Sequence, residues 1–468
     1  MNQWIGWRAL SHVCMLAAAA SLLIGCSPSE IPETPTSVVL VSIDTLRADA
    51  LSPYGGPVET PGFDQVALDG VLFERAFSPA AETAPSHATL FTGREVPSHG
   101  VYKNGIHLRD EAQTLAEVFR DEGYETAAFV SSWVLDPRFS WDRGFEVYDA
   151  EFPNDGGTMA KERAYPDALW LEESFAGLDR RGVMTVRAAA QWLARTKEPF
   201  FLFIHLFDPH APYWPPKKHQ EPLQAQRFQM AGRSAPGFTS EQLEGQIRNY
   251  HGEVRYADEV LDALLRAVDK KMDGDPPLVV IVADHGEGLG EHDLMEHALN
   301  LHDEQLHIPL LFRWRGRLPA GIRMRTSVGL VDVAPTILEL VGLPPFAAVE
   351  GRSLAKNLLA ASEPEARSIF ANRRSFSETY RRPLGRQVAL RSGGWKYIRR
   401  VGATDQLFDL GADPDEGTNR LHEAGAASRA KAMLEEIIAF EASMPEIEEV
   451  APLPDDVREN LRALGYAE

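Results

Sequence analysis

Cysteine is nearly absent from this chain, which has only Cys14 and Cys26 among its 468 residues. Both lie at the N-terminal end, so the rest of the chain can form no disulfide and depends on its core for stability. A hydrophobic content of 44% over this length is enough for a large core. We therefore expect one large domain and a smaller one.

Positive charge is also scarce, with 47 Lys and Arg residues against 68 Asp and Glu residues and a formal net charge of −21. Nucleic acids bind to basic surfaces, because the phosphate backbone must be neutralised. This composition excludes nucleic acid as the expected partner.

Apolar runs long enough to span a bilayer are missing too. The run at 13–24 is too short, and with Arg8 ahead of it predicts a signal peptide over 1–25. It ends in Gly25-Cys26, which resembles a bacterial lipoprotein signal. We expect cleavage before Cys26, lipidation of its thiol, a tether over 26–36 and a place in the bacterial cell envelope, facing the periplasm or at the outer membrane. A plain secretory peptide or an uncleaved anchor is the alternative.

Apolar runs that end at polar residues recur from residue 37 onwards. Runs at 37–43, 126–130, 200–207 and 278–283 end at Asp44, Ser131, Asp208 and Asp284. Helical patterns at 114–122, 183–195 and 253–268 lie between them, which predicts an α/β fold with a mostly parallel sheet. The carboxyl ends of parallel strands meet at one edge, where ligands bind.

Thr83 is the candidate nucleophile. It lies two residues before Pro85, and proline is favoured at the first position of a helix. Thr83 is then at a helix N-terminus, where free N–H groups and the helix dipole suit an oxygen that attacks an anionic ester. The alternative is that Thr83 only caps the helix.

Asp44, Asp284 and His285, with the Thr83 hydroxyl, form a candidate metal site. These oxygen and imidazole donors suit one divalent cation such as Ca²⁺, Mn²⁺, Mg²⁺ or Zn²⁺. A cation there would lower the proton affinity of the hydroxyl and polarise the ester. The two aspartates could instead cap helices; their joint placement at strand ends favours the metal.

Segments 41–49, 83–93 and 284–292 together resemble the sulfatase family of the alkaline phosphatase superfamily. The likeness continues at 331–336, 350–354, 394–398 and 407–410. The resemblance implies a sulfatase-like catalytic domain over 37–360, with a large, mostly parallel central sheet flanked by helices. It also implies a small C-terminal α+β domain over 361–468 with an antiparallel sheet, and a nucleophile that is covalently sulfated or phosphorylated beside one divalent cation.

Carried over by position, the resemblance implies further site residues. Asp44, Thr83, Asp284 and His285 match metal ligands, and Thr83 matches the nucleophile. His210 matches a histidine near the leaving group, and Asn104 an asparagine that binds the ester. Ser131 or Ser132 matches a hydroxyl that binds the ester, and His297 stands where many members have lysine, a place that a protonated imidazole could fill. His87 stands where sulfatases have arginine; it either donates near the nucleophile or sits in the first helical turn. His205 reads as an ordinary strand residue with satisfied nitrogens.

Two departures from the family bear on the chemistry. Sulfatases have Cys or Ser at the position of Thr83, which is oxidised to formylglycine, whereas threonine is not a known substrate for that oxidation. Thr45 replaces a second metal-binding aspartate, which favours one ion. We expect a metal-dependent hydrolase of small-molecule, glycan or lipid esters, with phosphate or phosphonate favoured. A true sulfatase and a catalytically silent anion-binding lipoprotein are the alternatives.

Overall fold

The computed structural model describes residues 35–152, 177–220, 235, 237–272, 275–373, 385–445 and 453–464. The expected signal peptide, Cys26 and most of the tether lie outside these ranges, as does much of the segment at 213–236 that the sequence predicts as a loop. Among the described helices, none combines the length and the apolar character that a membrane span needs.

The large sheet is built around β1 (Val38–Ile43), whose six side chains are all buried. β1 pairs in parallel with β5 (Phe200–Leu206) on one side and β6 (Leu278–Ala283) on the other. The sheet has the order β10-β2-β9-β6-β1-β5-β3-β4, with β11 beside β2. Its other strands are β2 (Val71–Phe77), β3 (Glu125–Phe129), β4 (Val147–Asp149), β9 (His307–Arg313), β10 (Ile322–Met324) and β11 (Val328–Gly329). Only β9 runs antiparallel to its neighbours, so the predicted mixed, mostly parallel sheet is confirmed.

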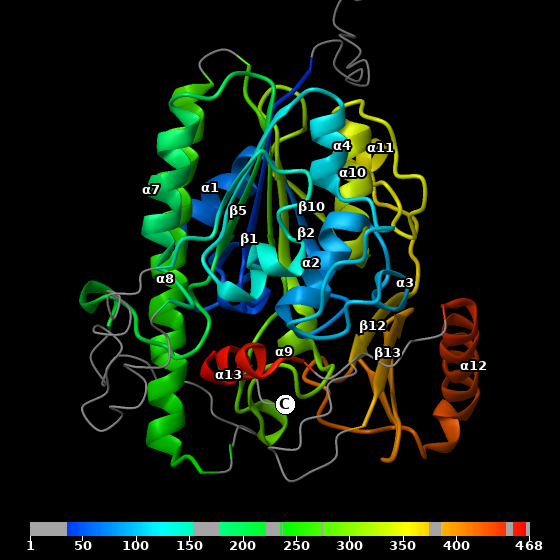
Figure 1. Cartoon of the computed structure of the whole chain (residues 1–468). Helices are drawn as coiled ribbons and strands as arrows, with labels where there is room; N and C mark the ends of the chain where they lie inside the picture. Colours follow the sequence, from blue (N-terminus) through cyan, green and yellow to red (C-terminus); the bar gives the residue numbers. More distant parts are fainter. Residues whose placement is uncertain are drawn as a thin grey trace, which may run out of the picture.

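Helices cover both faces of this sheet, as a strand buried on both faces requires. Figure 1 shows α1 (Pro61–Asp69), α7 (Gly182–Leu193) and α8 (Ser240–Lys271) on one face. The other face carries α2 (Thr83–Thr92), α4 (Leu115–Asp121), α10 (Val333–Leu340) and α11 (Ala355–Ala360). α8 begins at Ser240, whereas the sequence pattern predicts a helix from residue 253. A capping box between Thr239 and Gln242 starts the helix earlier, in a stretch that is largely exposed at first.

The small sheet consists of four antiparallel strands, β12 (Ile369–Arg373), β13 (Gln387–Ser392), β14 (Trp395–Arg400) and β15 (Gln406–Asp409). Val388 and Leu390 pack under α12 (Ala427–Ser443), whereas Ala389 between them packs toward Phe77 of the large domain. This alternation is the two-residue period of a strand buried on both sides.

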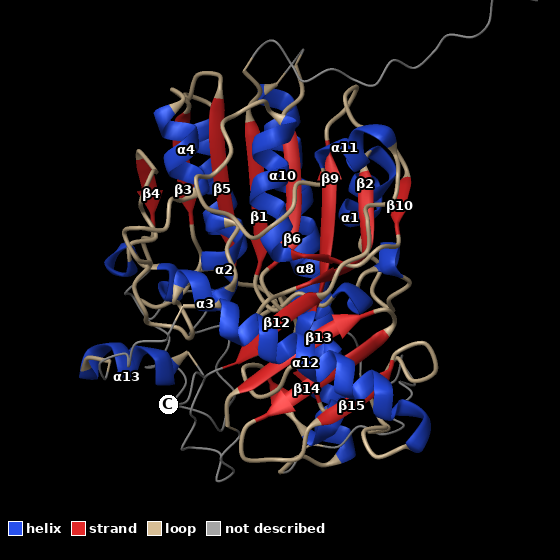
Figure 2. Cartoon of the chain, turned by 90° about the vertical axis from the view of Figure 1, so that its right-hand side faces the viewer, coloured by secondary structure: helices blue, strands red, loops and turns tan. Residues whose placement is uncertain are grey.

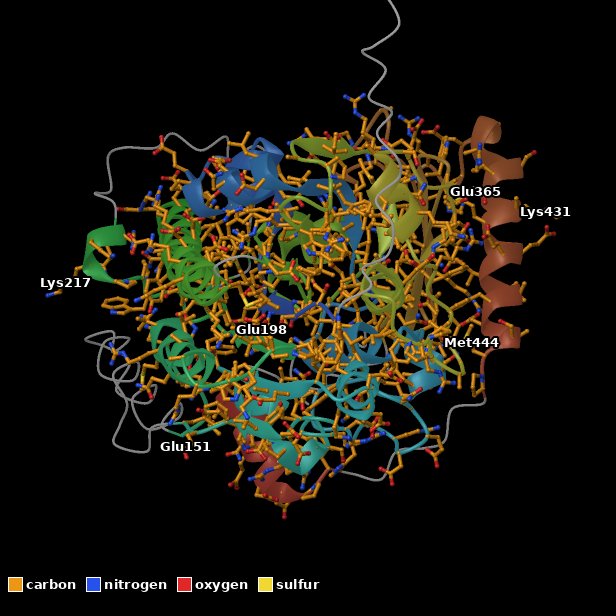
Figure 3. The ribbon with its side chains drawn as sticks, turned by 90° about the horizontal axis from the view of Figure 1, so that it is seen from above. Glu151, Glu198, Lys217, Glu365, Lys431 and Met444 are labelled. Carbon is orange, nitrogen blue, oxygen red and sulfur yellow. The ribbon has the colours of Figure 1, made fainter. Side chains whose placement is uncertain are left out.

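α13 (Asp455–Ala463) packs on the large domain through its buried side chains. Its Val457 and Leu461 lie against Gly105, where an added Cβ would meet both side chains at 3.1 Å. Figure 3 shows the outer side of α12, where Lys431 points away from the body. The remaining short elements are α3 (Val96–His99), β7 (Gly288–Leu289), β8 (Met295–Glu296) and α9 (Asp303–Leu306).

Candidate active site

The carboxyl ends of β1 and β6 place three of the predicted residues together. Asp44 follows β1, and Asp284 and His285 follow β6, at the edge that faces the small sheet in Figure 2. Nε2 of His285 lies 3.6 Å from Oδ1 of Asp44 and 3.6 Å from Oδ2 of Asp284. The hydroxyl of Thr83, the first residue of α2, donates to Oδ2 of Asp44 over 3.5 Å. All four side chains are fully buried.

These residues fit a divalent cation. Asp44 Oδ1, Asp284 Oδ2 and His285 Nε2 are buried and have no hydrogen-bond partner among the described residues. Each such atom costs on the order of 1–3 kcal/mol unless something binds it. Nδ1 of His285 lies 2.8 Å from the Gly286 carbonyl and donates to it, which leaves the lone pair on Nε2. Burial and the neighbouring Asp284 raise the pKa of Asp44 well above its usual value, and a bound cation would lower it by stabilising the carboxylate.

The N-terminus of α2 differs from the expectation. The helix begins at Thr83 after Glu82, and Pro85 is its third residue rather than its first. The backbone N–H of Ala84 donates to Oδ1 of Asn104 over 2.8 Å, and Pro85 has no N–H. The predicted group of free backbone donors is therefore reduced. The amide Nδ2 of Asn104, buried and without a hydrogen-bond partner in the described part of the chain, is a donor that a bound ester could use.

The imidazole rings of His285, His297 and His210 form a row that begins at the candidate metal site. The ring of His297 lies 4.6 Å from that of His285 and 4.9 Å from that of His210, measured between centroids. Nδ1 of His210 donates to the Ala211 carbonyl over 2.6 Å, which fixes the orientation of the ring. Nδ1 of His297 lies 3.2 Å from Glu287 Oε1. Burial lowers the pKa of His297 to about 4, so the ring is neutral near pH 7 rather than the protonated substitute for lysine that the sequence suggested.

A buried ion network that the sequence analysis missed holds the segment with His210. Nη1 of Arg181 lies 2.9 Å from Asp208 Oδ1 and 3.0 Å from Glu253 Oε2. Asp208 also accepts from the Gly182 N–H, and Glu253 accepts from the Trp214 N–H. Asp208 and Trp214 flank His210, so the network fixes both ends of this segment. Arg181 and Glu253 are distant in sequence, and only the packing of α7 against α8 brings them together.

Ser131 and Ser132 use their hydroxyls within the fold. Ser131 shares a 2.7 Å hydrogen bond with Thr185 of α7. Ser132 accepts from the Val134 N–H at the start of a short 3₁₀ helix, Trp133–Leu135. His87 is the fifth residue of α2, and its Nδ1 donates to the Thr83 carbonyl over 2.8 Å, which is the expected donation near the nucleophile. Burial lowers the pKa of His87 to about 3, so it brings no positive charge in place of arginine.

His205 lies in a strand, as the sequence predicts, but the prediction that its nitrogens are satisfied was wrong. It is fully buried in β5, yet neither ring nitrogen has a hydrogen-bond partner among the described residues. Its Nε2 lies 3.5 Å from Asp44 Oδ2, and its ring centroid lies 5.1 Å from that of His87. The available signal was the strand register, which pairs His205 with Ser42, two residues before Asp44.

A second cluster, His292, His302 and Glu304, lies toward the small domain. Nδ1 of His292 is 3.1 Å from Glu304 Oε1, and its Nε2 is 3.2 Å from the Glu416 carbonyl. Since both nitrogens donate, His292 has no lone pair for a metal. Its ring stacks on that of His302 at 3.8 Å. This cluster therefore connects the two domains rather than completing the candidate site.

Comparisons with known proteins agree with this geometry. The sequence profile of the family described as sulfatase matches residues 36–343. A second profile, described as the C-terminal region of N-sulphoglucosamine sulphohydrolase, matches residues 290–443. The curated relatives include the ulvan-active sulfatase of Formosa agariphila, 25% identical over 412 residues that span 83% of this chain and 77% of that protein.

Two further comparisons extend the range of chemistry. The multifunctional alkaline phosphatase superfamily protein PehA of Trinickia caryophylli is 24% identical over 476 residues, which span 82% of this chain and 91% of that protein. The phosphonate monoester hydrolase of Agrobacterium radiobacter has a similar fold, with a TM-score of 0.73 and 24% identity over 90% of this chain and 100% of that one. Proteins with this fold therefore include both sulfatases and a phosphonate hydrolase.

Proposed function

The chain belongs to the sulfatase family, within the alkaline phosphatase superfamily of ester hydrolases, and on that premise we propose that it hydrolyses phosphoric or phosphonic esters with Thr83 as nucleophile. The observation that carries this proposal is the hydrogen bond from the Thr83 hydroxyl to Asp44. It lies next to three buried donor atoms suited to a cation, Asp44 Oδ1, Asp284 Oδ2 and His285 Nε2, which have no hydrogen-bond partner in the described structure.

The proposed reaction has two steps. The Thr83 oxygen forms a bond to phosphorus while the bond from phosphorus to the leaving oxygen breaks, and the proton lost by Thr83 ends on the leaving alcohol. Water then attacks the phosphorylated threonine, the Thr83 oxygen leaves phosphorus, and it regains a proton from that water. A divalent cation held by Asp44, Asp284, His285 and Thr83 would supply Lewis acidity at a hydroxyl and an ester oxygen.

The surrounding side chains have assignable tasks in this proposal. The buried amide Nδ2 of Asn104 donates to a non-bridging oxygen of the ester, where negative charge increases in the transition state. His210, with Nδ1 fixed by the Ala211 carbonyl, presents Nε2 toward the leaving oxygen. His297 contributes a neutral imidazole beside the same group. Asp44 orients the nucleophile, since its Oδ2 accepts the Thr83 hydroxyl.

The choice of phosphorus over sulfur depends on Thr83. In sulfatases the nucleophile is an oxidised Cys or Ser, whose aldehyde hydrate provides a route to expel sulfate. Threonine has no such route, whereas water can cleave a phosphorylated threonine. Sulfate esters are the second candidate substrates, because curated relatives such as the ulvan-active sulfatase are described as sulfatases.

A panel of esters with one leaving group tests the proposal. Four 4-nitrophenyl esters serve as substrates: a phosphodiester, a phosphonate monoester, a phosphate and a sulfate. Hydrolysis of each is measured with the chelated protein and with the protein reloaded with Ca²⁺, Mn²⁺ or Zn²⁺. We expect kcat/KM for a phosphodiester or phosphonate to exceed that for the sulfate. A higher value for the sulfate would reject the phosphorus preference, and no turnover of any ester would favour a binding protein.

We also propose that the chain acts at the bacterial cell envelope, tethered through a lipid on Cys26. The small residue Gly25 before this cysteine and the short apolar run ahead of it support the proposal. At such a surface the ester could be part of a glycan or a lipid as well as a small molecule.

A further inference from the structure

We propose that His87, His205 and Asp284 form a second cation position, distinct from the one at Asp44, Asp284 and His285 and suited to Zn²⁺ or a similar borderline metal. One ring nitrogen of each histidine and one oxygen of Asp284 lie within 4.8 Å of one another. The proposal goes beyond the reaction described above and holds whichever ester is the substrate.

The buried polar atoms outnumber what one cation can satisfy. An ion at the first position would bind Asp44 Oδ1, Asp284 Oδ2 and His285 Nε2. It would leave His87 Nε2 and both nitrogens of His205, all of them buried and without a hydrogen-bond partner among the described residues. Buried polar atoms without partners destabilise the folded state, so these nitrogens call for a bound group.

The hydrogen bond of His87 is the one expected of a metal ligand. Its Nδ1 donates to the Thr83 carbonyl over 2.8 Å and lies 3.8 Å from Asp284 Oδ2, so the lone pair that would bind an ion is on the other nitrogen, Nε2. Histidines that bind metals commonly donate their other nitrogen to a carbonyl in this way. His285 at the first position makes the same bond, to the Gly286 carbonyl. His87 and His285 therefore share the same hydrogen-bond pattern, one histidine at each cation position.

The rings are arranged so that both can contribute. The planes of His87 and His205 are nearly perpendicular, at 77°, and their centroids are 5.1 Å apart. The cluster at His292 and His302 shows the contrast, because those rings are stacked at 11°, and lone pairs in parallel planes do not converge on one point.

The donor sets of the two positions differ in kind. The first has carboxylate and hydroxyl oxygens with one imidazole, which suits hard cations. The second has two imidazoles and one carboxylate, which suits zinc. With Asp44 and Asp284 as the shared negative charges, two divalent ions would leave a net positive site for an anionic ester.

Zinc stoichiometry of the full chain tests the proposal. The chelated protein is loaded with Zn²⁺, freed of unbound metal and analysed for zinc per chain. We expect two ions in the wild type and one in H205L and in H87L. Should either leucine variant fail to fold, H205Q keeps a hydrogen-bonding group in the strand and is expected to bind one ion. His302 is also buried with both nitrogens unpartnered in the described structure, so H302L is the matched control and should keep two.

X-ray absorption at the zinc edge gives an independent reading. Two ions with three imidazoles between them are expected in the wild type, and loss of His205 should leave one imidazole per ion. One zinc per wild-type chain would overturn the proposal, since a buried water would then occupy the place. Two zinc ions retained in folded H205Q would overturn it as well. Neither readout depends on turnover, so failure here is distinguishable from failure of the proposed reaction.

Discussion

The 2.8 Å hydrogen bond from the Ala84 N–H to Asn104 Oδ1 decides which end of the Asn104 amide remains for a ligand. Because the backbone donor must meet the oxygen, the NH₂ group is the end left over, and it is buried without a partner in the described structure. One side chain thus caps α2 and offers a donor next to the nucleophile. The neighbouring Gly105 is in turn covered by α13, which supports this segment from the C-terminal end of the chain.

Asn104→Asp separates these two tasks. The carboxylate still accepts from Ala84, so folding should be retained, but it offers no donor and repels an anionic ester. We expect kcat/KM to fall by about 10²–10³-fold, as for other oxyanion donors. Asn104→Ala should lose the cap as well and be less stable by about 1 kcal/mol. Unchanged kcat/KM in the aspartate variant would remove Asn104 from the ester site.

Thr83→Ala should abolish turnover while the fold persists. We expect a loss of about 10³-fold or more in kcat, because no other described hydroxyl is placed on Asp44. Thr83→Ser is the matched control, since it keeps the hydroxyl and should retain activity. After rapid quenching with a phosphonate ester, intact-mass and peptide analysis should find the added group on residue 83. An active alanine variant would disprove the nucleophile.

Metal removal should lower both activity and stability. A ligand that binds only the folded state at 1,000 times its Kd stabilises that state by about 4 kcal/mol. We therefore expect chelation to lower the Tm by several degrees and divalent ions to restore it. Asp44→Asn should respond less than the wild type, because its first cation position is already impaired and only the proposed second position at His87, His205 and Asp284 remains. Equal responses in the two proteins would place the stabilising ion elsewhere.

Much of the fold could be predicted because its strands are unambiguous. β1 and β6 are continuous apolar runs with β-branched residues, and each ends at an aspartate. Parallel pairing then forces those aspartates to one edge. The sequence analysis assigned no strand to Ile369–Arg373. Among the described strands, β12 pairs with β13 alone, at the edge of the small sheet, and no local pattern marks such an edge strand.

The site could be predicted only where local sequence marks it. Thr83 and Asp284 stand in recognisable segments, but the role of His205 follows from register against β1, which no local pattern reveals. Arg181 is similar, since its partners come from a loop and from α8. The prediction of a positive charge on His297 was wrong for another reason. Burial decides whether this ring is protonated, and burial is a property of the packed structure.

Cys26→Ala tests the proposed anchor. Without the thiol no lipid can be attached, so we expect the protein to move from the membrane fraction to the soluble fraction of the envelope. Labelling with a fatty-acid analogue should mark the wild type and not the variant. Cys14→Ala is the control, because that residue lies within the expected signal and should not affect anchoring. Labelled Cys26→Ala would assign the lipid to another residue.

The pair of His292 and Glu304 makes stability depend on pH in a defined window. Burial lowers the pKa of His292, but Glu304 and the Glu416 carbonyl outweigh burial and raise it to about 9. Burial raises the pKa of Glu304, but His292 outweighs it and lowers the value to about 2. A histidine whose folded pKa is raised stabilises the fold fully below its unfolded value, near 6.5, and loses that contribution as the pH rises through 9.

His292→Gln isolates this contribution, because Gln keeps a donor but no charge. We expect the wild type to be more stable by on the order of 1 kcal/mol at pH 6, since the pair is partly open to solvent. The difference should shrink progressively between pH 6.5 and 9, where Glu304 is ionised in both proteins. Chemical unfolding of the two proteins at each pH measures it. A difference that stays constant over this range would mean that His292 stabilises the domain contact by packing on His302 and not by its charge.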